Sequence, residues 1–517
     1  MNYKIKEFLK FSWKKILLTL ILLIFTGFLA FNLFSTGLQD TLIPVIGVLG
    51  FPLIFSFILT PCPFIFVTIL IIELLWLYFI SCILMKIIIF LKNKIISINW
   101  TTKKLIILSV IIIIGFTTYG FFNFGWGDIF IPTADDKEAT PEGVAEVIKA
   151  NNQFSIDLYS EISKKSNENI FFSPWSISTA MAMVYEGARG DTAKEIQDVF
   201  HFPEDNITRR SSFAKMLNMI NKCGGKYQLT TVNAIWLQKN YPFLKDYENI
   251  IKKYYLGEIK NIDFANNPEE SSSDINNWIS KNTNNKIKHM VSPNTFNELT
   301  RAVLTNAIYF KGRWVHQFDR DDTRPKDFTL DSGAKIKVPM MKLMDNDIDF
   351  NYVESDKIQI LELAYQGDKI SMLVLLPRNN ISYLESILTE EKFQEWRSKL
   401  KPETVYINMP KYTLETSYPL INYLKNLGMT LPFTGSGTDF SGMDGTKMLY
   451  INKFLHKAYI NVYEEGTEAA ATTTIFTTFG MAMPVEFNAN HPFIFIIQEK
   501  ETGNILFMGR VTDPTKP

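Results

Sequence analysis

The sequence has few of the side chains that bind metals or carry out covalent chemistry. Only three cysteines and five histidines occur among 517 residues. No HExxH or CxxC pattern, no phosphate-binding loop and no GxSxG nucleophile motif is present. A hydrolase would need a serine or cysteine nucleophile beside a base, and no local pattern supplies one. We therefore predict that the chain is not an enzyme and that it has no catalytic residues, no metal and no cofactor.

The scarcity of cysteine also limits how the chain can be stabilised. Cys62 and Cys82 lie in an apolar N-terminal part, and Cys223 is the only cysteine after residue 125. The larger C-terminal part therefore cannot contain an internal disulfide, and its stability must come from a hydrophobic core.

Acidic residues are almost absent from the first 125 residues. This part holds three acids and ten lysines, a net charge of +7, so the remainder of the neutral chain carries −7. It is rich in Ile, Leu and Phe, whereas the rest has the mixed composition of a soluble domain. We therefore divide the chain into a membrane module (residues 1–124), a polar linker (125–145) and a soluble domain (146–517).

Three apolar runs of the membrane module are long enough to cross a bilayer. They are residues 16–34, 64–84 and 105–124, and about 20 helical residues cover a hydrocarbon core of about 30 Å. A fourth run, residues 42–60, contains prolines and is either a further span or a re-entrant or interfacial segment. A cleaved signal peptide accounts only for the first run. We expect three transmembrane helices, with four as the alternative, and the lipid bilayer as a partner.

Lysines indicate the orientation of these spans. Five lysines precede the first run, and five more lie between residues 86 and 104, before the last run. Lysine-rich loops stay on the cytoplasmic side, so three spans would place both clusters inside and release the chain outside. We expect a multi-pass protein of the cell membrane whose soluble domain lies on the outer, extracellular side. Four spans would place one lysine cluster outside or the domain in the cytoplasm.

Near the C-terminus, residues 464–474 (EEGTEAAATTT) combine a glycine with small and β-branched residues. Ala and Thr lose little side-chain entropy on burial, and Thr favours an extended strand. In such a strand, alternate residues from Thr467 share one face without charge, whereas Glu468 points to the other face. We interpret the segment as an exposed loop that attracts a partner and can become a buried strand. A surface loop without consequence is the alternative on composition alone.

Other motifs place this segment in a wider pattern. In chain order they are NIFFSPWSIS (169–178), WISKNTNNKI (278–287), LTNAIYFKGRW (304–314), VPMM (338–341), DFSGM (439–443), FNANHPFIF (487–495) and GNILFMGRV (503–511). Together they resemble the serpins, over residues 147–514, the size of one complete serpin domain. The resemblance implies a mixed α+β fold with three β-sheets, about nine helices and an exposed reactive-centre loop.

The resemblance also implies a mechanism in which the partner does the chemistry. A serine or cysteine endopeptidase would take the exposed loop as a substrate and form an acyl intermediate with it. The cleaved loop would then insert into the central sheet as a new strand and distort the tethered protease. The chain would thus be a membrane-anchored suicide substrate whose native fold is kinetically trapped.

Individual residues take roles from this resemblance. The hinge of the loop comprises Glu464, Gly466, Thr467, Ala469, Ala470 and Ala471. Glu464 and its basic partner Lys411 would hold the entry point of the sheet closed, beside Trp314. Four residues would form a polar group under the centre of the sheet: Ser173, Ser176, Asn306 and His456. From the residues alone, Ser173 is also a helix N-cap and His456 a buried core histidine.

The sequence places the scissile bond to within a few residues. A count of seventeen residues from Glu464, the usual family spacing, places the bond between Gly480 and Met481. A count back from the following strand puts Met481 before the cut, and Phe479 is a third candidate. No lysine or arginine occurs between residues 467 and 484, which disfavours trypsin-like targets. We expect an elastase-, subtilisin- or chymotrypsin-like protease, and no nucleic acid, as the partner.

Two other functions remain open. The first is a non-inhibitory serpin-fold module for binding or adhesion at the cell surface. It is disfavoured because bulky, charged or proline residues would block insertion, and none is present on the face of the hinge that alternates from Thr467. The second makes the membrane module a sensor or transporter, with the serpin-like domain as its extracellular regulator; its support is Glu73 inside a span and the proline-broken run at residues 42–60.

Overall fold

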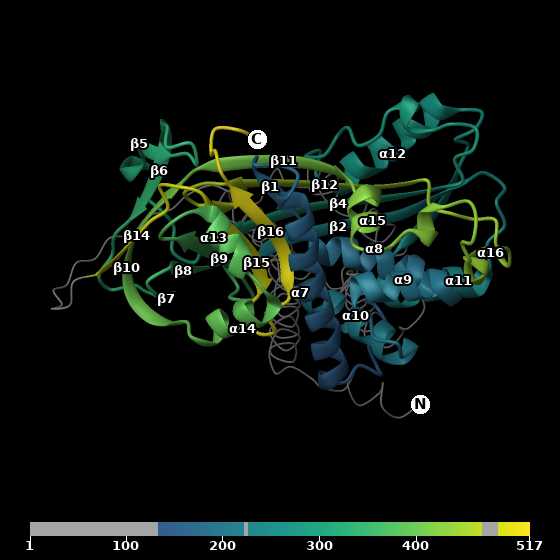
Figure 1. Cartoon of the computed structure of the whole chain (residues 1–517), viewed down its shortest axis with the longest axis horizontal. Helices are drawn as coiled ribbons and strands as arrows, with labels where there is room; N and C mark the ends of the chain where they lie inside the picture. Colours follow the sequence, from purple (N-terminus) through teal and green to yellow (C-terminus); the bar gives the residue numbers. More distant parts are fainter. Residues whose placement is uncertain (1–132, 222–225, 468–483) are drawn as a thin grey trace, which may run out of the picture. The chain divides into compact units, whose positions relative to one another are not determined.

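The computed structural model describes residues 133–221, 226–467 and 484–517 (Figure 1). The expected membrane module and residues 125–132 of the expected linker lie outside the described residues. So do five residues of the expected loop: Ala469, Ala470, Ala471, Gly480 and Met481. Among the described residues, no helix is both long and apolar enough to span a bilayer. The transmembrane helices and their topology stay predictions.

Ten α-helices occur among the described residues, against about nine expected. They are α7 (Pro141–Ser163), α8 (Pro174–Gly187), α9 (Gly190–Phe200), α10 (Asn206–Asn221), α11 (Lys245–Ile250), α12 (Pro268–Asn282), α13 (Ile381–Ile387), α14 (Glu390–Ser398), α15 (Ile421–Asn426) and α16 (Ser441–Asp444). Helices α7 and α8 each begin at a proline that follows an N-cap residue with a hydroxyl group. Thr140 accepts a hydrogen bond from the amide of Gly143 in α7, and Ser173 does the same for Ser176 in α8.

The folded domain begins earlier than the expected boundary at residue 146. Helix α7 already starts at Pro141. Upstream of it, Ala134 exchanges two hydrogen bonds of 2.9 Å with the side chain of Asn218 in α10. Asp135 also lies 3.4 Å from the ammonium group of Lys253. This stretch lacks apolar periodicity, so its composition suggested a linker, whereas polar contacts attach it to the domain.

The described residues form two sheets, and the smaller has six strands in the order β11-β12-β4-β2-β3, with β13 also paired to β4. Their bounds are β2 (Tyr227–Gln238), β3 (Glu258–Ile262), β4 (Ala302–Arg313), β11 (Tyr412–Pro419), β12 (Lys453–Val462) and β13 (Gly466–Thr467). β12 pairs with β4 in parallel, from Lys453 opposite Val303 to Tyr459 opposite Tyr309. β4 is buried along almost its whole length because both faces of the sheet are covered. Ile308 and Phe310 belong to the large core, and Val303 and Ala307 to a smaller cluster that includes residues of α12.

Counted over the described residues, the larger sheet has ten strands. They are β1 (Ile170–Phe172), β5 (Arg324–Thr329), β6 (Lys335–Leu343), β7 (Asp349–Glu354), β8 (Ile358–Ala364), β9 (Ile370–Pro377), β10 (Lys401–Pro410), β14 (Val485–Asn488), β15 (Phe493–Glu499) and β16 (Ile505–Val511). Three sheets were expected, and two of them are joined here through β10. Its first residues, from Lys401 to Thr404, pair with β7, and its last, from Ile407 to Pro410, pair with β6.

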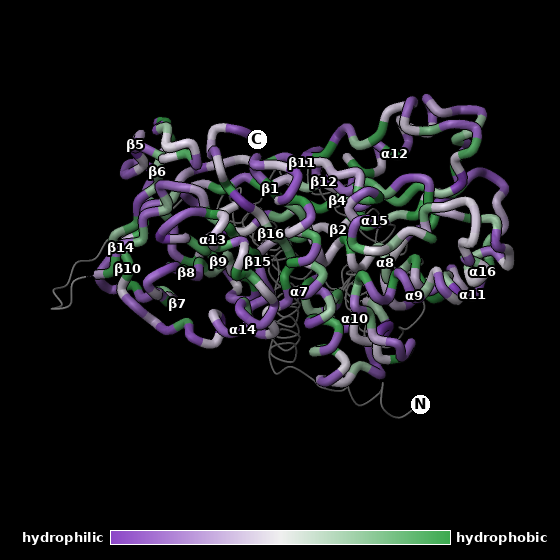
Figure 2. Tube along the Cα trace, viewed as in Figure 1, coloured by the Kyte–Doolittle hydropathy of each residue, from purple (hydrophilic) through white to green (hydrophobic). Residues whose placement is uncertain are grey.

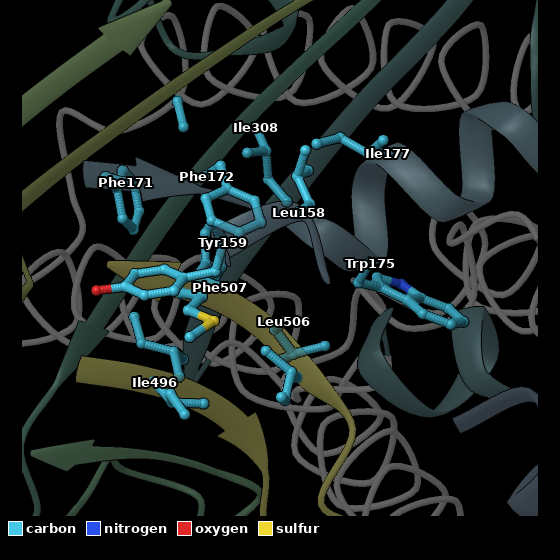
Figure 3. Close-up of a cluster of buried hydrophobic side chains, with 14 of the residues drawn as sticks. Leu158, Tyr159, Phe171, Phe172, Trp175, Ile177, Ile308, Ile496, Leu506 and Phe507 are labelled. Atoms are coloured by element: carbon cyan, nitrogen blue, oxygen red, sulfur yellow. The ribbon is translucent and has the colours of Figure 1, made fainter. Parts of the chain in front are cut away.

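The large core lies between the two sheets and around α8. Strands β9, β15 and β16 are buried at every position. Figure 2 shows hydrophobic residues running through these interior strands, whereas the outer helix α14 is largely hydrophilic. Trp175 and Ile177 of α8 are directed into the same core as Leu506 and Phe507 of β16 (Figure 3). This packing fixes the start of α8 beneath the six-stranded sheet.

Candidate functional site at the end of strand β12

The chain reverses immediately after β12. The backbones of Tyr463 and Gly466 exchange two hydrogen bonds of 3.0 and 3.1 Å, which enclose Glu464 and Glu465 in a two-residue turn. Gly466 and Thr467 then pair antiparallel with Arg313 and Gly312 at the end of β4. This pairing lies beyond the last paired residues of β12 and β4. The hinge therefore starts a new strand, β13, against β4.

Glycine is the only residue type that fits at position 466 without a shift of the surrounding backbone. Its φ of +140° is unfavourable for any residue with a side chain. An added Cβ would lie 2.2 Å from the carbonyl oxygen of Gly312 and 2.6 Å from Cα of Arg313. The expected pivot is thus defined by lack of space as well as by its φ angle.

Thr467 is completely buried, and its hydroxyl lies 3.1 Å from the hydroxyl of Tyr365. The Tyr365 ring stacks on Trp314, with centroids 4.4 Å apart, and meets Phe310 edge-on at 4.8 Å. Burial raises the pKa of Tyr365 well above its usual value, so its hydroxyl keeps its proton. The Trp314 ring donates to the carbonyl of Tyr463 at 3.1 Å, and so holds the end of β12.

Glu464 and its expected partner Lys411 are brought together. The ammonium group of Lys411 lies 3.0 and 2.9 Å from the two carboxylate oxygens, and the hydroxyl of Thr323 donates at 2.8 Å. Burial opposes ionisation of this carboxyl group, but the hydrogen bonds from Lys411, the backbone and Thr323 lower the pKa of Glu464 below its usual value. Because Lys411 follows β10, the pair attaches the turn to the strand shared by the joined sheets.

Glu465 has a different environment. Its side chain is 1% exposed, and neither carboxylate oxygen has a hydrogen-bond partner among the described residues. The guanidinium group of Arg320 forms an ion pair with one of these oxygens. The backbone carbonyl of Glu465 accepts a hydrogen bond from the amide of Trp314 at 2.9 Å. A carboxylate held in this way is costly, and Arg320 is the cation that offsets the cost.

Farther down β12, a row of polar side chains crosses the sheet. His456, Asn306 and Asn233 lie directly opposite one another on β12, β4 and β2. The amide of Ser173 donates to Nε2 of His456 at 3.1 Å, so Nδ1 carries the proton and donates to Oδ1 of Asn306. The amide group of Asn306 donates to Oγ of Ser176 at 2.5 Å and to Oδ1 of Asn233. All four residues expected in this polar group are therefore in one network.

The network connects the sheet to α8 and β16. The hydroxyl of Ser173 caps α8 and donates to the carbonyl of Leu506 at 2.6 Å, so its capping role and its place in the polar group coexist. His456 is completely buried, and burial lowers its pKa to about 3. It is therefore neutral at physiological pH. Parting β12 from β4 would break the contact between His456 and Asn306.

A family model described as serpin (serine protease inhibitor) matches residues 149–514. The chain belongs to the serpin family. A serpin-like protein of Thermococcus kodakarensis is 42% identical over 374 residues, covering 71% of this chain and 86% of its own length. The leukocyte elastase inhibitor of Xenopus tropicalis is 38% identical over 374 residues, which cover 71% of this chain and 98% of that protein. The solved structure of Serpin48 from Tenebrio molitor matches with a TM-score of 0.64, at 33% identity and coverage of 71% and 98%.

This serpin thus belongs to a family of protease inhibitors and not to an enzyme family. Among its described residues, no group of histidine, cysteine or acidic side chains is arranged to hold a metal ion. Three residues that contact the hinge and one in the polar row were not expected from the sequence: Arg320, Thr323, Tyr365 and Asn233. Only Asn233 had a sequence signal, and a weak one, because it is an amide directly before the apolar run 234–237.

Proposed function

We propose that this serpin inhibits a serine or cysteine endopeptidase as a suicide substrate, by inserting its cleaved loop into the six-stranded sheet. The observation that carries the proposal is β13. Its two residues already form an antiparallel pairing with β4, and Thr467 points into the core. Insertion would therefore extend a strand that exists.

The register of β13 determines where each residue after Thr467 would lie in the inserted strand. Continued along β4, it places Ala469 opposite Phe310 and Ala471 opposite Ile308, both of which face the large core. Alternation keeps this face free of charge. Glu468 would turn to the other face, opposite Lys311, where unlike charges are favourable. Small, uncharged side chains suit a strand that would face this core.

Insertion would exchange one ladder for two. The parallel ladder between β12 and β4 has seven residue pairs, and it must part before a strand can enter. The new strand would then pair antiparallel with both neighbours. Each added hydrogen bond contributes roughly 1 kcal/mol, so the cut and inserted form would be the more stable one. The His456–Asn306 contact lies within the part that must open.

The target is proposed to be an elastase-, subtilisin- or chymotrypsin-like protease. Phe479, Gly480 and Met481 are the candidates for the residue before the cut, and none is basic. Pockets that select such residues do so by shape and apolar contact. One relative is a leukocyte elastase inhibitor, which agrees with this class.

The site of action is proposed to be the outer face of the cell membrane. The support is the sequence pattern of apolar runs and lysines before residue 125. Intact cells that display the protein should lose the domain to an added protease that does not enter cells. Protection until the cells are lysed would contradict an outer location.

The inhibitory function is tested by incubating the full-length protein with a panel of proteases. We expect an adduct that resists boiling in detergent with elastase or subtilisin, and release of a C-terminal peptide whose mass gives the cut site. Cleavage without an adduct for every protease would favour a non-inhibitory binding or adhesion module instead. Efficient trapping of trypsin alone would contradict the proposed target class.

A further inference from the structure

Tyr365 lies where the two sheets meet. It follows β8, and its neighbours in the chain bond to the end of β4: the amide of Val315 donates to Ala364, and the amide of Gln366 donates to Arg313. Its ring is completely buried and stacked on Trp314. These contacts fix the direction of the hydroxyl, which points at Thr467.

The hydroxyl of Tyr365 has one hydrogen-bond partner among the described residues, Thr467. If the hinge left the sheet, this buried hydroxyl would lose that partner, and an unpaired buried polar group is unfavourable. The same contact would be kept when the loop inserts fully, because Thr467 is already in register. Tyr365 therefore favours a hinge that is inside the sheet, both before and after cleavage.

We propose that Tyr365 is a positioning residue that captures Thr467 in the sheet before the loop is cut. This inference rests on the proposed function. After cleavage, insertion competes with hydrolysis of the acyl intermediate. The first residues of a new strand are the hardest to place, since their backbone is ordered before neighbouring pairs form. When Tyr365 already holds the hinge, these first residues are in place before cleavage. Insertion is then faster relative to hydrolysis of the acyl intermediate, and more protease is trapped.

Two variants remove the contact from opposite sides. Tyr365→Phe deletes one hydroxyl, and Thr467→Val deletes the other while keeping a β-branched side chain. In the full-length protein, we expect each to accelerate hydrogen exchange of the hinge amides about five-fold, the effect of losing one typical hydrogen bond. Each should also raise the number of inhibitor molecules consumed per trapped protease, by two- to five-fold. Because the two hydroxyls act on each other, the double variant should show no larger an effect than either single one.

The matched control is Tyr247→Phe. Tyr247 is also a buried tyrosine, and within the described part of the chain its hydroxyl has one hydrogen-bond partner, the carbonyl of Met183 at 3.0 Å, away from the hinge. This variant should lower the melting temperature without changing hinge exchange or the inhibitor consumed. A general loss of stability is thereby separated from a positioning role.

The exchange measurement needs no protease, so the two proposals fail separately. Unchanged hinge exchange in Tyr365→Phe, or additive effects in the double variant, would overturn the role of Tyr365. Faster exchange together with no adduct from the wild-type protein would keep the hinge contact and refute the inhibitory function.

Discussion

Replacing Thr467 with arginine should convert the inhibitor into a substrate. The Thr467 side chain is 0% exposed, and it faces the buried ring of Tyr365. In the uncut protein, the two residues of β13 can leave the sheet, which limits the loss to about 2–3 kcal/mol, the worth of a few hydrogen bonds. In the inserted form, the strand cannot leave, and a buried unpaired cation costs several kcal/mol or more. The substitution thus penalises the trapped state far more than the starting state.

The assay is the yield of detergent-resistant adduct with a protease that the wild-type protein traps. Thr467→Arg should be cut at the same bond and give little adduct, with the inhibitor consumed per trapped protease raised at least ten-fold. Glu468→Gln is the control, because it changes the neighbouring position, which alternation turns to the other face, without placing a second cation opposite Lys311. It should trap the protease with nearly the wild-type yield. Stable adducts of Thr467→Arg at wild-type yield would refute insertion along the register of β13.

Three further predictions concern the hinge and the polar row. Gly466→Ala should expel β13, since a Cβ would lie 2.2 Å from the carbonyl oxygen of Gly312; urea unfolding should show a loss of about 1–3 kcal/mol, and unchanged stability together with unchanged hinge exchange would contradict the geometry. Lys411→Met leaves the buried Glu464 carboxylate with Thr323 as its remaining side-chain partner among the residues that the structure describes. We expect a loss of about 1–3 kcal/mol at pH 7, below the full value for a buried pair because the Lys411 side chain is 38% exposed. The loss should shrink toward pH 4, because the lowered pKa of Glu464 contributes stability only while the carboxylate is ionised; a pH-independent loss would show that the charge pair is not its cause. His456 has a folded-state pKa of about 3 against an ordinary value of 6.5, so the unfolded chain binds the extra proton between these values. Its contribution to stability is therefore present above pH 6.5 and is lost as the pH falls, by up to about 1.4 kcal/mol per unit. His456→Gln should flatten urea-unfolding stability between pH 6.5 and 5 relative to wild type, and an equal slope in both proteins would contradict a neutral buried His456.

Part of the site follows from local sequence, and another part follows from the family resemblance. The glycine and the alternation after it predicted a strand with one uncharged face, and Thr467 does point inward. The motif order predicted that His456, Asn306 and the two serines would meet, although they come from β12, β4 and the start of α8. Such contacts join residues more than 100 positions apart, so the family resemblance, and not periodicity, was what predicted them.

Other features depend on tertiary packing that no local pattern records. Tyr365 and Arg320 have ordinary sequence surroundings, and they reach the hinge because the end of β8 and the segment after β4 fold against it. The joining of two expected sheets arises because β10 is long enough to pair with different strands at its two ends. The early start of the domain was missed because residues 133–140 attach through polar contacts, which leave no apolar pattern.

The most direct measurement is the melting temperature of the protein before and after a single cut in the loop between Phe479 and Ala482. Because the released strand would replace one ladder by two, the nicked protein should melt more than about 10 °C higher than the uncut protein. Equal melting temperatures would mean that relaxation by strand gain does not occur in this serpin.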